Sequence, residues 1–226
     1  DLNQFCKTVG RLVADNPVQN VPALIADYLP EILGDRDLLS AEHKALPPEG
    51  YGRHDVFLCP NDDFSIIAAV WPAGIVSPIH DHKTWCTFGV FEGVIQETLY
   101  RAVSDDPSCT DAVPVEMIEH LPGDVAHLPV GGGDIHCMHN PTDKAAVSVH
   151  VYGGNSVKLG PNVVKVYQET AAAIADGSQL NALLRRNGIS CRRRGTYCLK
   201  KGELKCAQLF CTNTVILIIS NIMKIM

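Results

Sequence analysis

Hydrophobic residues at the start of the chain follow a helical period. Over the first 46 residues they recur at steps of three and four, as in "FCKTVGRLV" (5–13) and "VPALIADYLPEIL" (21–33). Pro22 and Pro30 interrupt this pattern. Steps of three and four are typical of amphipathic helices. Residues 1–46 are therefore predicted to form an N-terminal helical segment that packs on the rest of the protein.

From about residue 51 to residue 152 the period changes. Short runs rich in Val, Ile and Phe alternate with Gly, Pro, Asn and Asp; the runs are "DVFLC" (55–59), "FSIIAAVW" (64–71), "TFGVFEGVIQETLY" (87–100), "VEMIEHL" (115–121), "VAHLPV" (125–130) and "AAVSVHVY" (145–152). Many short strands separated by turn residues are typical of an antiparallel sandwich or barrel. The fold class is predicted to be all-β, with this barrel in a domain spanning 47–187.

The last part of the chain has a different composition. A helix is predicted over 168–186, and the tail at 188–226 carries four of the nine cysteines. We interpret this tail as atypical, an alternative or read-through C-terminus without a functional role. A β-hairpin within the tail is the alternative interpretation.

Composition and charge exclude several classes of protein. The formal net charge of −6 argues against a nucleic-acid surface. Nine cysteines without a CxxC pair favour free thiols in a reducing compartment. The apolar run at 214–223 is too short to span a membrane and contains Ser220 and Asn221. The sequence starts without Met and shows no signal-peptide core. We expect a cytoplasmic protein with neither a nucleic-acid nor a membrane partner.

Two motifs bring histidines into register. The first, "SPIHDHKTWC" (77–86), places His80 and His82 on one side of a strand, where both could bind one metal ion. With its flanking glycines, Gly74 and Gly93, it reads G-x5-H-x-H-x3-C-x6-G. The second motif follows about forty residues later as G-x5-P-x3-G-x2-H-x3-N; its members are Gly123, Pro129, Gly133, His136 and Asn140.

These motifs resemble those of the cupin superfamily, whose first motif contains HxH and a glutamate and whose second adds a third histidine. Cys86 stands at the glutamate position, and two extra residues separate Pro129 from Gly133. The resemblance implies a double-stranded β-helix, or jelly-roll, barrel. Losing the glutamate leaves a site of three neutral histidines, unlike the two-histidine, one-carboxylate triad of many iron oxygenases.

A third pattern narrows the resemblance. Ser148, His150 and Tyr152 alternate in "SVHVY", so all three lie on one side of a strand. This spacing beside a three-histidine site is similar to that of the thiol dioxygenases, namely cysteine dioxygenase and 3-mercaptopropionate dioxygenase. The resemblance spans residues 49–157 and includes "YGR", "FSIIAAVWPAG", "PIHDHKTW", "GVFEGVIQETLY", "GDIHCMHN" and "SVHVYGGN".

The thiol dioxygenase resemblance implies a role for each candidate residue. His80, His82 and His136 would bind one Fe(II) ion per chain. Tyr152 would place its hydroxyl beside the substrate and dioxygen, held by His150, which Ser148 orients.

Further residues would act on the substrate or on the relay. Arg53 would pair with the substrate carboxylate, and Tyr51 would flank the same pocket. Cys86 is predicted to form a thioether cross-link to Tyr152, with a small buried core cysteine as the alternative. Trp71 and Trp85 are interpreted as barrel packing, and His127 and His139 lie off the motif.

The sequence thus predicts an iron-dependent thiol dioxygenase that converts a small thiol carboxylate, L-cysteine first, and O2 to a sulfinic acid in cysteine catabolism. The alternatives are 3-mercaptopropionate dioxygenase and a cupin without oxygenase activity, either of the isomerase type with Zn or Ni or a binding protein. The sequence does not determine the oligomeric state, for which a monomer is the working expectation.

Overall fold

The computed structural model describes residues 1–128 and 134–170 and three short strands further on. The chain divides into two compact units, Asp1–Thr170 and Ala171–Met226. In the second unit β11 (Ile189–Arg192), β12 (Thr196–Leu199) and β13 (Ala207–Gln208) form an antiparallel sheet. This pairing agrees with the hairpin alternative for the tail. The helix predicted over 168–186 lies outside the described residues from position 171 on.

The N-terminal segment forms two helices, α1 (Leu2–Asp15) and α2 (Val21–Leu33). The Asp1 side chain caps α1 by accepting a hydrogen bond of 3.1 Å from the Gln4 amide. Pro22 stands in the first turn of α2, where its missing N–H costs nothing, whereas Pro30 lies inside that helix. The predicted helical segment is therefore present, although turns replace helix after α2.

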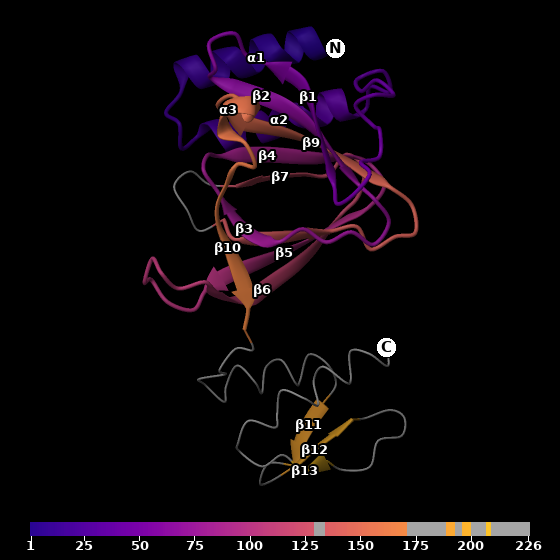
Figure 1. Cartoon of the computed structure of the whole chain (residues 1–226), viewed down its shortest axis with the longest axis vertical. Helices are drawn as coiled ribbons and strands as arrows, with labels where there is room; N and C mark the ends of the chain where they lie inside the picture. The colour runs from indigo at the N-terminus through magenta and orange to yellow at the C-terminus, as the bar shows by residue number, and fades with distance from the viewer. Residues whose placement is uncertain (129–133, 171–188, 193–195, 200–206, 209–226) are drawn as a thin grey trace. The chain divides into compact units, whose positions relative to one another are not determined.

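The first unit contains two sheets, one above the other in Figure 1, in which all strand pairs are antiparallel except the parallel pair of β10 with β6. The upper sheet has the order β1 (Gly52–Leu58), β2 (Phe64–Trp71), β9 (Ala146–Gly153), β4 (Cys86–Glu92) and β7 (Val125–Leu128). The lower sheet has the order β10 (Val163–Glu169), β3 (Ile79–His82), β8 (His136–His139), β5 (Ile95–Ala102) and β6 (Asp111–His120). It closes because β10 also pairs with β6. A short helix, α3 (Ser156–Leu159), precedes β10. The predicted all-β class with an N-terminal helical segment is confirmed.

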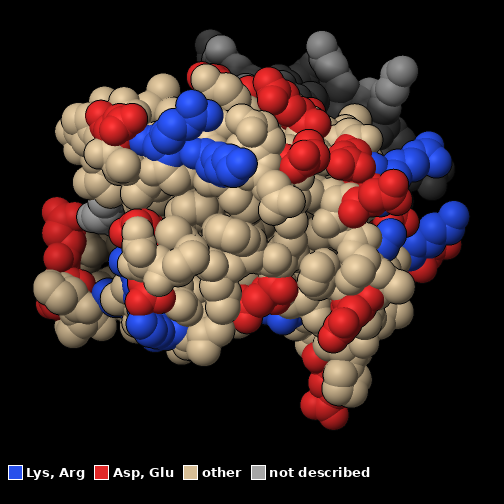
Figure 2. Space-filling view, turned by 90° about the horizontal axis from the view of Figure 1, so that it is seen from above, with Lys and Arg blue, Asp and Glu red and all other residues tan. Residues whose placement is uncertain are grey.

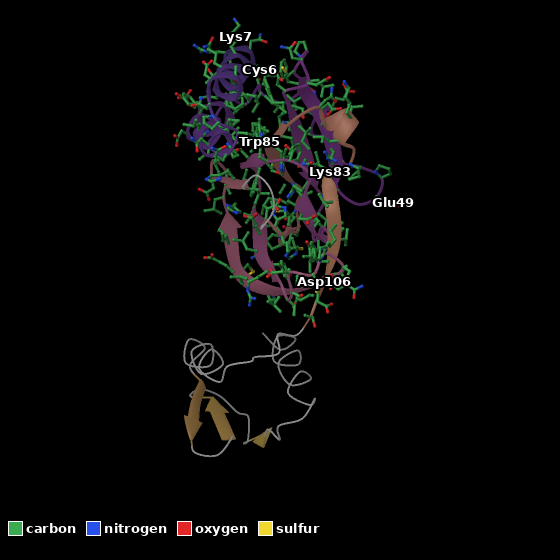
Figure 3. All side chains as sticks on the ribbon, turned by 90° about the vertical axis from the view of Figure 1, so that its left-hand side faces the viewer. Cys6, Lys7, Glu49, Lys83, Trp85 and Asp106 are labelled. Carbon is green, nitrogen blue, oxygen red and sulfur yellow. The ribbon has the colours of Figure 1, made fainter. Side chains whose placement is uncertain are left out.

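Strands β2 and β9 are buried on both faces, and accordingly β2 is almost wholly apolar, whereas β9 alternates valines with the polar residues Ser148, His150 and Tyr152. On one face, Val147, Val149 and Val151 of β9 pack with the two helices in a core layer. Cys6 of α1 and Trp85 beside β4 belong to the same layer (Figure 3). The helices thus cover the outside of the upper sheet, and the alternate residues of each strand face the barrel interior.

Turn glycines of the two motifs adopt backbone angles that favour glycine. The φ angles of Gly74, Gly93 and Gly123 are +69°, +81° and +94°. At Gly93, between β4 and β5, a Cβ atom would lie 2.7 Å from the Ala146 Cβ atom. Glycine is therefore required at this turn both by φ and by the close approach of β9.

The face over the N-terminal helices carries mixed charge. Basic side chains lie in small separate groups among acidic ones on the face shown in Figure 2, in keeping with the net charge of −6. Among the described residues, no helix is both long enough and apolar enough to span a membrane.

Candidate active site

Three histidines meet inside the barrel. His80 and His82 come from β3, and His136 comes from β8, where it pairs directly opposite His80. One ring nitrogen of each histidine lies within 4.8 Å of the others. The period of two along β3 sends both of its histidines to this side of the strand. The pairing of β3 with β8 thus brings together three nitrogen donors that come from two distant motifs of the sequence.

A hydrogen bond to Nδ1 orients each ring. The Nδ1 atom of His80 lies 2.8 Å from the Pro78 carbonyl oxygen, and that of His82 lies 2.7 Å from Asp134 Oδ2. The Nδ1 atom of His136 lies 2.6 Å from Glu97 Oε1. Each acceptor favours a proton on Nδ1, which leaves the Nε2 lone pair free. Three free lone pairs at this spacing fit a metal ion.

Burial disfavours the protonated form of the two β3 imidazoles, His80 and His82. Burial is the largest effect on the pKa of His80, which it lowers to about 3, and it also lowers the pKa of His82. For Glu97, burial alone would raise the pKa, but hydrogen bonds from His120 and His136 outweigh it and lower the pKa to about 2. The ring nitrogens of His80 and His82 are consequently available without proton competition at neutral pH, while Glu97 stays ionised.

The candidate relay residues lie on β9 and are hydrogen-bonded to one another. Ser148 Oγ is 2.8 Å from His150 Nε2, and Tyr152 Oη is 3.4 Å from His150 Nδ1. Trp71 Nε1 donates a hydrogen bond of 2.8 Å to Ser148 Oγ. Since indole can only donate, the Ser148 hydroxyl hydrogen is free for His150 Nε2. Hydrogen bonds can then be donated in order from Trp71 to Ser148, from Ser148 to His150 and from His150 to Tyr152. The hydroxyl hydrogen of Tyr152 is left to donate to a ligand.

Trp71 therefore does more than the barrel packing predicted from the sequence. Its ring also stacks on Tyr51, with 4.7 Å between centroids. The sequence gives little sign of this hydrogen bond. Trp71 is the last residue of an apolar run, and its indole N–H is the one polar group that sets it apart from the aliphatic residues there. Its partner Ser148 lies 77 positions away in the chain.

Cys86 stands directly opposite Tyr152 in the pairing of β4 with β9. Its Sγ atom is 3.6 Å from His150 Nδ1, the atom that also faces the Tyr152 hydroxyl. Burial, followed by nearby carboxylates, raises the pKa of the Cys86 thiol well above its usual range. Burial and Cys86 together raise the pKa of Tyr152 well above its usual range. Both groups therefore stay protonated and neutral at physiological pH and can donate hydrogen bonds.

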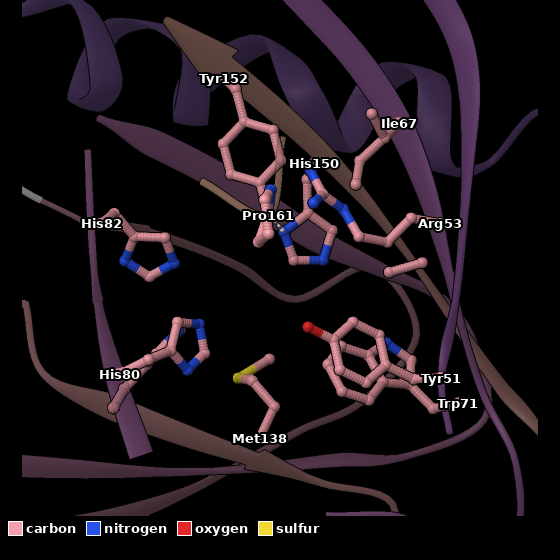
Figure 4. A pocket seen from close by; sticks show the side chains of 12 residues that line it. Tyr51, Arg53, Ile67, Trp71, His80, His82, Met138, His150, Tyr152 and Pro161 are labelled. Atoms are coloured by element: carbon pink, nitrogen blue, oxygen red, sulfur yellow. Dashed lines mark hydrogen bonds between the residues drawn. The ribbon is translucent and has the colours of Figure 1, made fainter. Parts of the chain in front are cut away.

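Arg53 and Tyr51 line the cavity opposite the histidines, with Met138 between the two walls (Figure 4). Arg53 Nη1 donates a hydrogen bond of 2.8 Å to the Gly160 carbonyl oxygen. Its guanidinium carbon lies 5.7 Å from the centre of the Tyr152 ring. Arg53 is the single cation among the described residues that line the cavity, and none of those residues is acidic. The cavity is thus suited to a small anion close to the three histidines.

Reasoning from the sequence missed the polar residues behind the histidines. Asp134 and Glu97 contact two of the candidate ligands, and His120 contacts Glu97. Glu97 could have been suspected because it is a charged residue inside a strand predicted to face the core. His127, off the motif, is exposed on β7, away from this network.

A family model for cysteine dioxygenase type I matches residues 17–155, more than half of the chain. The chain belongs to the cysteine dioxygenase type I family. The barrel is accordingly a cupin barrel, as the sequence motifs predicted. Membership in this family implies a metal-dependent dioxygenase acting on a small thiol with O2.

Solved structures of cupins are similar to this cysteine dioxygenase family member. A Cupin 2 conserved barrel domain protein from Salinispora arenicola is 20% identical, with a TM-score of 0.37, over 53% of this chain and 90% of that chain. An RmlC-like cupin family protein from Methanocaldococcus jannaschii is 15% identical, with a TM-score of 0.37, over 54% of this chain and 91% of that chain.

Proposed function

We propose that this protein is an iron-dependent thiol dioxygenase that oxidises L-cysteine with O2 to cysteine sulfinate. One observation carries the proposal. In a member of the cysteine dioxygenase family, one cavity brings together three histidines, a single arginine and the hydrogen-bonded Ser148–His150–Tyr152 relay. Such a set suits a substrate with a thiolate at one end and a carboxylate at the other.

His80, His82 and His136 are the proposed ligands of one Fe(II) ion per chain. Neutral imidazole is a good ligand for iron, and the three oriented rings leave further coordination positions open. When bound, iron would supply the coordination of thiolate and O2 through which both oxygen atoms reach sulfur.

The protein's own residues position the two reactants. Arg53 would pair with the substrate carboxylate, because a guanidinium offers two parallel N–H donors that match a carboxylate. Its bond to Gly160 and its place over the Tyr152 ring restrict where that carboxylate can lie. Tyr51 would bound the same end of the pocket through its stack on Trp71.

The relay would place one neutral O–H donor beside the substrate and O2. Tyr152 is buried and protonated, and His150 would donate from Nδ1 to its hydroxyl oxygen, which leaves the Tyr152 hydrogen for a ligand. Ser148 in turn fixes the His150 ring. A rigid donor acts by orientation, and this is how a site with few reacting groups can direct oxygen to sulfur.

3-Mercaptopropionate is the second candidate substrate. No acidic residue is found among the described cavity-lining residues, so the amine that distinguishes cysteine from this thiol would have no carboxylate partner there. Arg53 would serve the carboxylate of either compound.

Dioxygen consumption tests the proposal. Iron-loaded protein would be supplied in parallel with L-cysteine and 3-mercaptopropionate, and the products identified by mass. Faster uptake with cysteine and formation of its sulfinate support the proposal, whereas preference for 3-mercaptopropionate transfers it to the second substrate. Bound metal without thiol-dependent uptake would contradict both and favour a cupin without oxygenase activity, of the isomerase or binding type.

A thioether between Cys86 and Tyr152 is a further part of the proposal. The two residues face each other across β4 and β9. Formation of the C–S bond would remove the thiol hydrogen and one ring hydrogen, with O2 accepting the two electrons and two protons. Intact mass after turnover should fall by about two daltons in the wild type and not in Cys86→Ala. An unchanged wild-type mass after many turnovers would contradict the cross-link.

A further inference from the structure

We propose that the buried carboxylates of Glu97 and Asp134 are the charge partners of a divalent metal ion at the three histidines, and that His120 is a positioning residue that acts through Glu97. The inference rests on the metal-binding part of the proposed function. It concerns residues behind the candidate ligands, in the part of the barrel that does not line the cavity.

Glu97 stands in the interior with both carboxylate oxygens occupied. Its Oε1 atom is 2.6 Å from His136 Nδ1, and its Oε2 atom is 2.9 Å from His120 Nε2. The side chain is only 2% exposed. A carboxylate this deep in a barrel is costly unless positive charge or strong donors surround it. Two imidazole donors satisfy its hydrogen bonds, and a metal ion bound on the far side of the His136 ring would supply positive charge close to the carboxylate.

Asp134 repeats the arrangement on a second candidate ligand. Its Oδ2 atom accepts from both the backbone amide and the Nδ1 atom of His82, at 3.1 and 2.7 Å. Its Oδ1 atom is buried and has no hydrogen-bond partner in the described part of the chain. A buried carboxylate with one oxygen unsatisfied is stabilised chiefly by a nearby positive charge. Each of the two carboxylates thus lies directly behind a candidate ligand, where it would act as a charge partner of a divalent ion held by the three histidines.

The two buried carboxylates would supply the negative charge that the missing glutamate of the cupin motif would bring to the metal ion. Cys86 occupies the position where the cupin motif has a glutamate, so no carboxylate of that motif binds the ion directly. Here the negative charge stands one residue further out, behind His82 and His136. Open coordination positions are thereby preserved without leaving the ion's charge unbalanced inside the barrel.

His120 fixes the outer end of this network. It comes from the last position of β6, is 5% exposed, and its ring lies edge-on to Phe88 with 5.3 Å between centroids. Its hydrogen bond to Oε2 restricts rotation of the Glu97 carboxylate, so that Oε1 stays within hydrogen-bonding distance of His136 Nδ1. Removing it would let Glu97 rotate and would loosen the orientation of the His136 ring.

Metal affinity tests the proposal without turnover. Co²⁺ would be competed from the protein with a chelator for the wild type, Glu97→Gln, Asp134→Asn and a control, Glu119→Gln, which removes one exposed carboxylate from β6. Losing a partner behind a ligand typically weakens metal binding about 10- to 100-fold. We expect this loss in both buried variants, with the control unchanged. Buried variants that bind Co²⁺ as tightly as the control would overturn the proposal.

A second measurement separates charge pairing from a purely structural role. A charge partner of the ion adds this stabilisation only when the ion is bound, so Glu97→Gln should lower the melting temperature of the Co²⁺-loaded protein more than that of the metal-free protein. In iron-loaded protein the same variant should raise the Fe(III)/Fe(II) reduction potential, because a nearby negative charge stabilises the ferric ion. Equal losses of melting temperature with an unchanged potential would show that Glu97 only supports the fold.

His120 is tested by a pair of variants. His120→Gln can still donate to Glu97 and should keep most of the Co²⁺ affinity, whereas His120→Phe should lose affinity as Glu97→Gln does. Equal affinity in the two variants would overturn the positioning role. Wild-type protein that binds no Co²⁺ would defeat this inference together with the proposed iron site, whereas tight binding without thiol oxidation would defeat only the proposed function.

Discussion

His150 is a histidine that the fold keeps neutral. Burial, and next the positive charge of Arg53, lower its pKa from 6.5 to about 3. In the unfolded chain this residue binds a proton below pH 6.5, whereas in the folded chain it binds one only below about pH 3. Stability from this group is consequently lost as the pH falls through that window.

Replacing His150 should flatten the pH dependence of stability. Between pH 7 and pH 5 the metal-free wild type should lose about 2 kcal/mol of unfolding free energy through this residue, and His150→Gln should not. Urea unfolding of both proteins at the two pH values measures the difference. Parallel loss in the two proteins would mean that His150 is already protonated in the fold.

Arg53 should act on one end of the substrate only. Arg53→Gln removes a charge-assisted pair worth about 1.5–3 kcal/mol, so KM for L-cysteine should rise about 10- to 100-fold. Cysteamine, a thiol without a carboxylate, serves as the control, and its KM should stay unchanged. A similar rise for both thiols would show that Arg53 shapes the pocket without binding a carboxylate.

The candidate site was predictable where one strand carries the pattern. HxH on β3 and Ser148–His150–Tyr152 on β9 follow the period of two, so their side chains had to share a face. Glu97 and His120 were not predictable, because the contacts of Glu97 with His136 and with His120 depend on the register of three strands from different parts of the sequence. Strand register is set by packing across the barrel, which no local pattern encodes.

Among the elements, β2 and β4 were recognisable from their apolar runs, whereas β8 and β10 were not. Strand β8 has only four residues, two of them histidines, and β10 alternates exposed and buried positions with few large apolar groups facing inward. Short strands that receive their stability from neighbours lack a pattern of their own.

The turn between β4 and β5 is the place where backbone geometry is most restrictive. Gly93→Ala would combine positive φ with a contact of 2.7 Å to Ala146, whereas Gly74→Ala would meet open space. Left-handed backbone costs about 1–2 kcal/mol for a residue with a side chain. Gly74→Ala should lose about this much, and Gly93→Ala should lose clearly more. Urea midpoints of the two variants make the comparison, and equal losses would contradict a steric role for Ala146.

At the scale of the whole molecule, the first unit contains every candidate site residue. Its lower sheet closes within that unit, where Gln168 of β10 pairs with Asp111 of β6. A chain ending at Thr170 should therefore fold and bind Co²⁺ with the affinity of the full chain. Circular dichroism and chelator competition measure both properties. Loss of metal binding on truncation would show that residues 171–226 support the barrel.

The helical layer is equally a property of the whole first unit. Leu29 of α2 is fully buried in the core layer against β2 and β9, the strands that carry the relay and its tryptophan anchor. Helices that the sequence marks only as amphipathic thus form the outer wall behind the reacting groups. Their cover also explains why the outward-facing residues of β9, Val147, Val149 and Val151, are apolar.

The pairing of β3 with β8 has a consequence for the resistance of the protein to proteolysis. These two four-residue strands are joined at a single paired position, His80 opposite His136, although they lie far apart in the sequence. An ion held from both strands acts as a reversible cross-link and restrains the chain as a staple would. Metal-free protein should therefore open more often at this pairing and be cleaved more readily by proteases. Metal supply would then influence the abundance of the protein as well as its turnover.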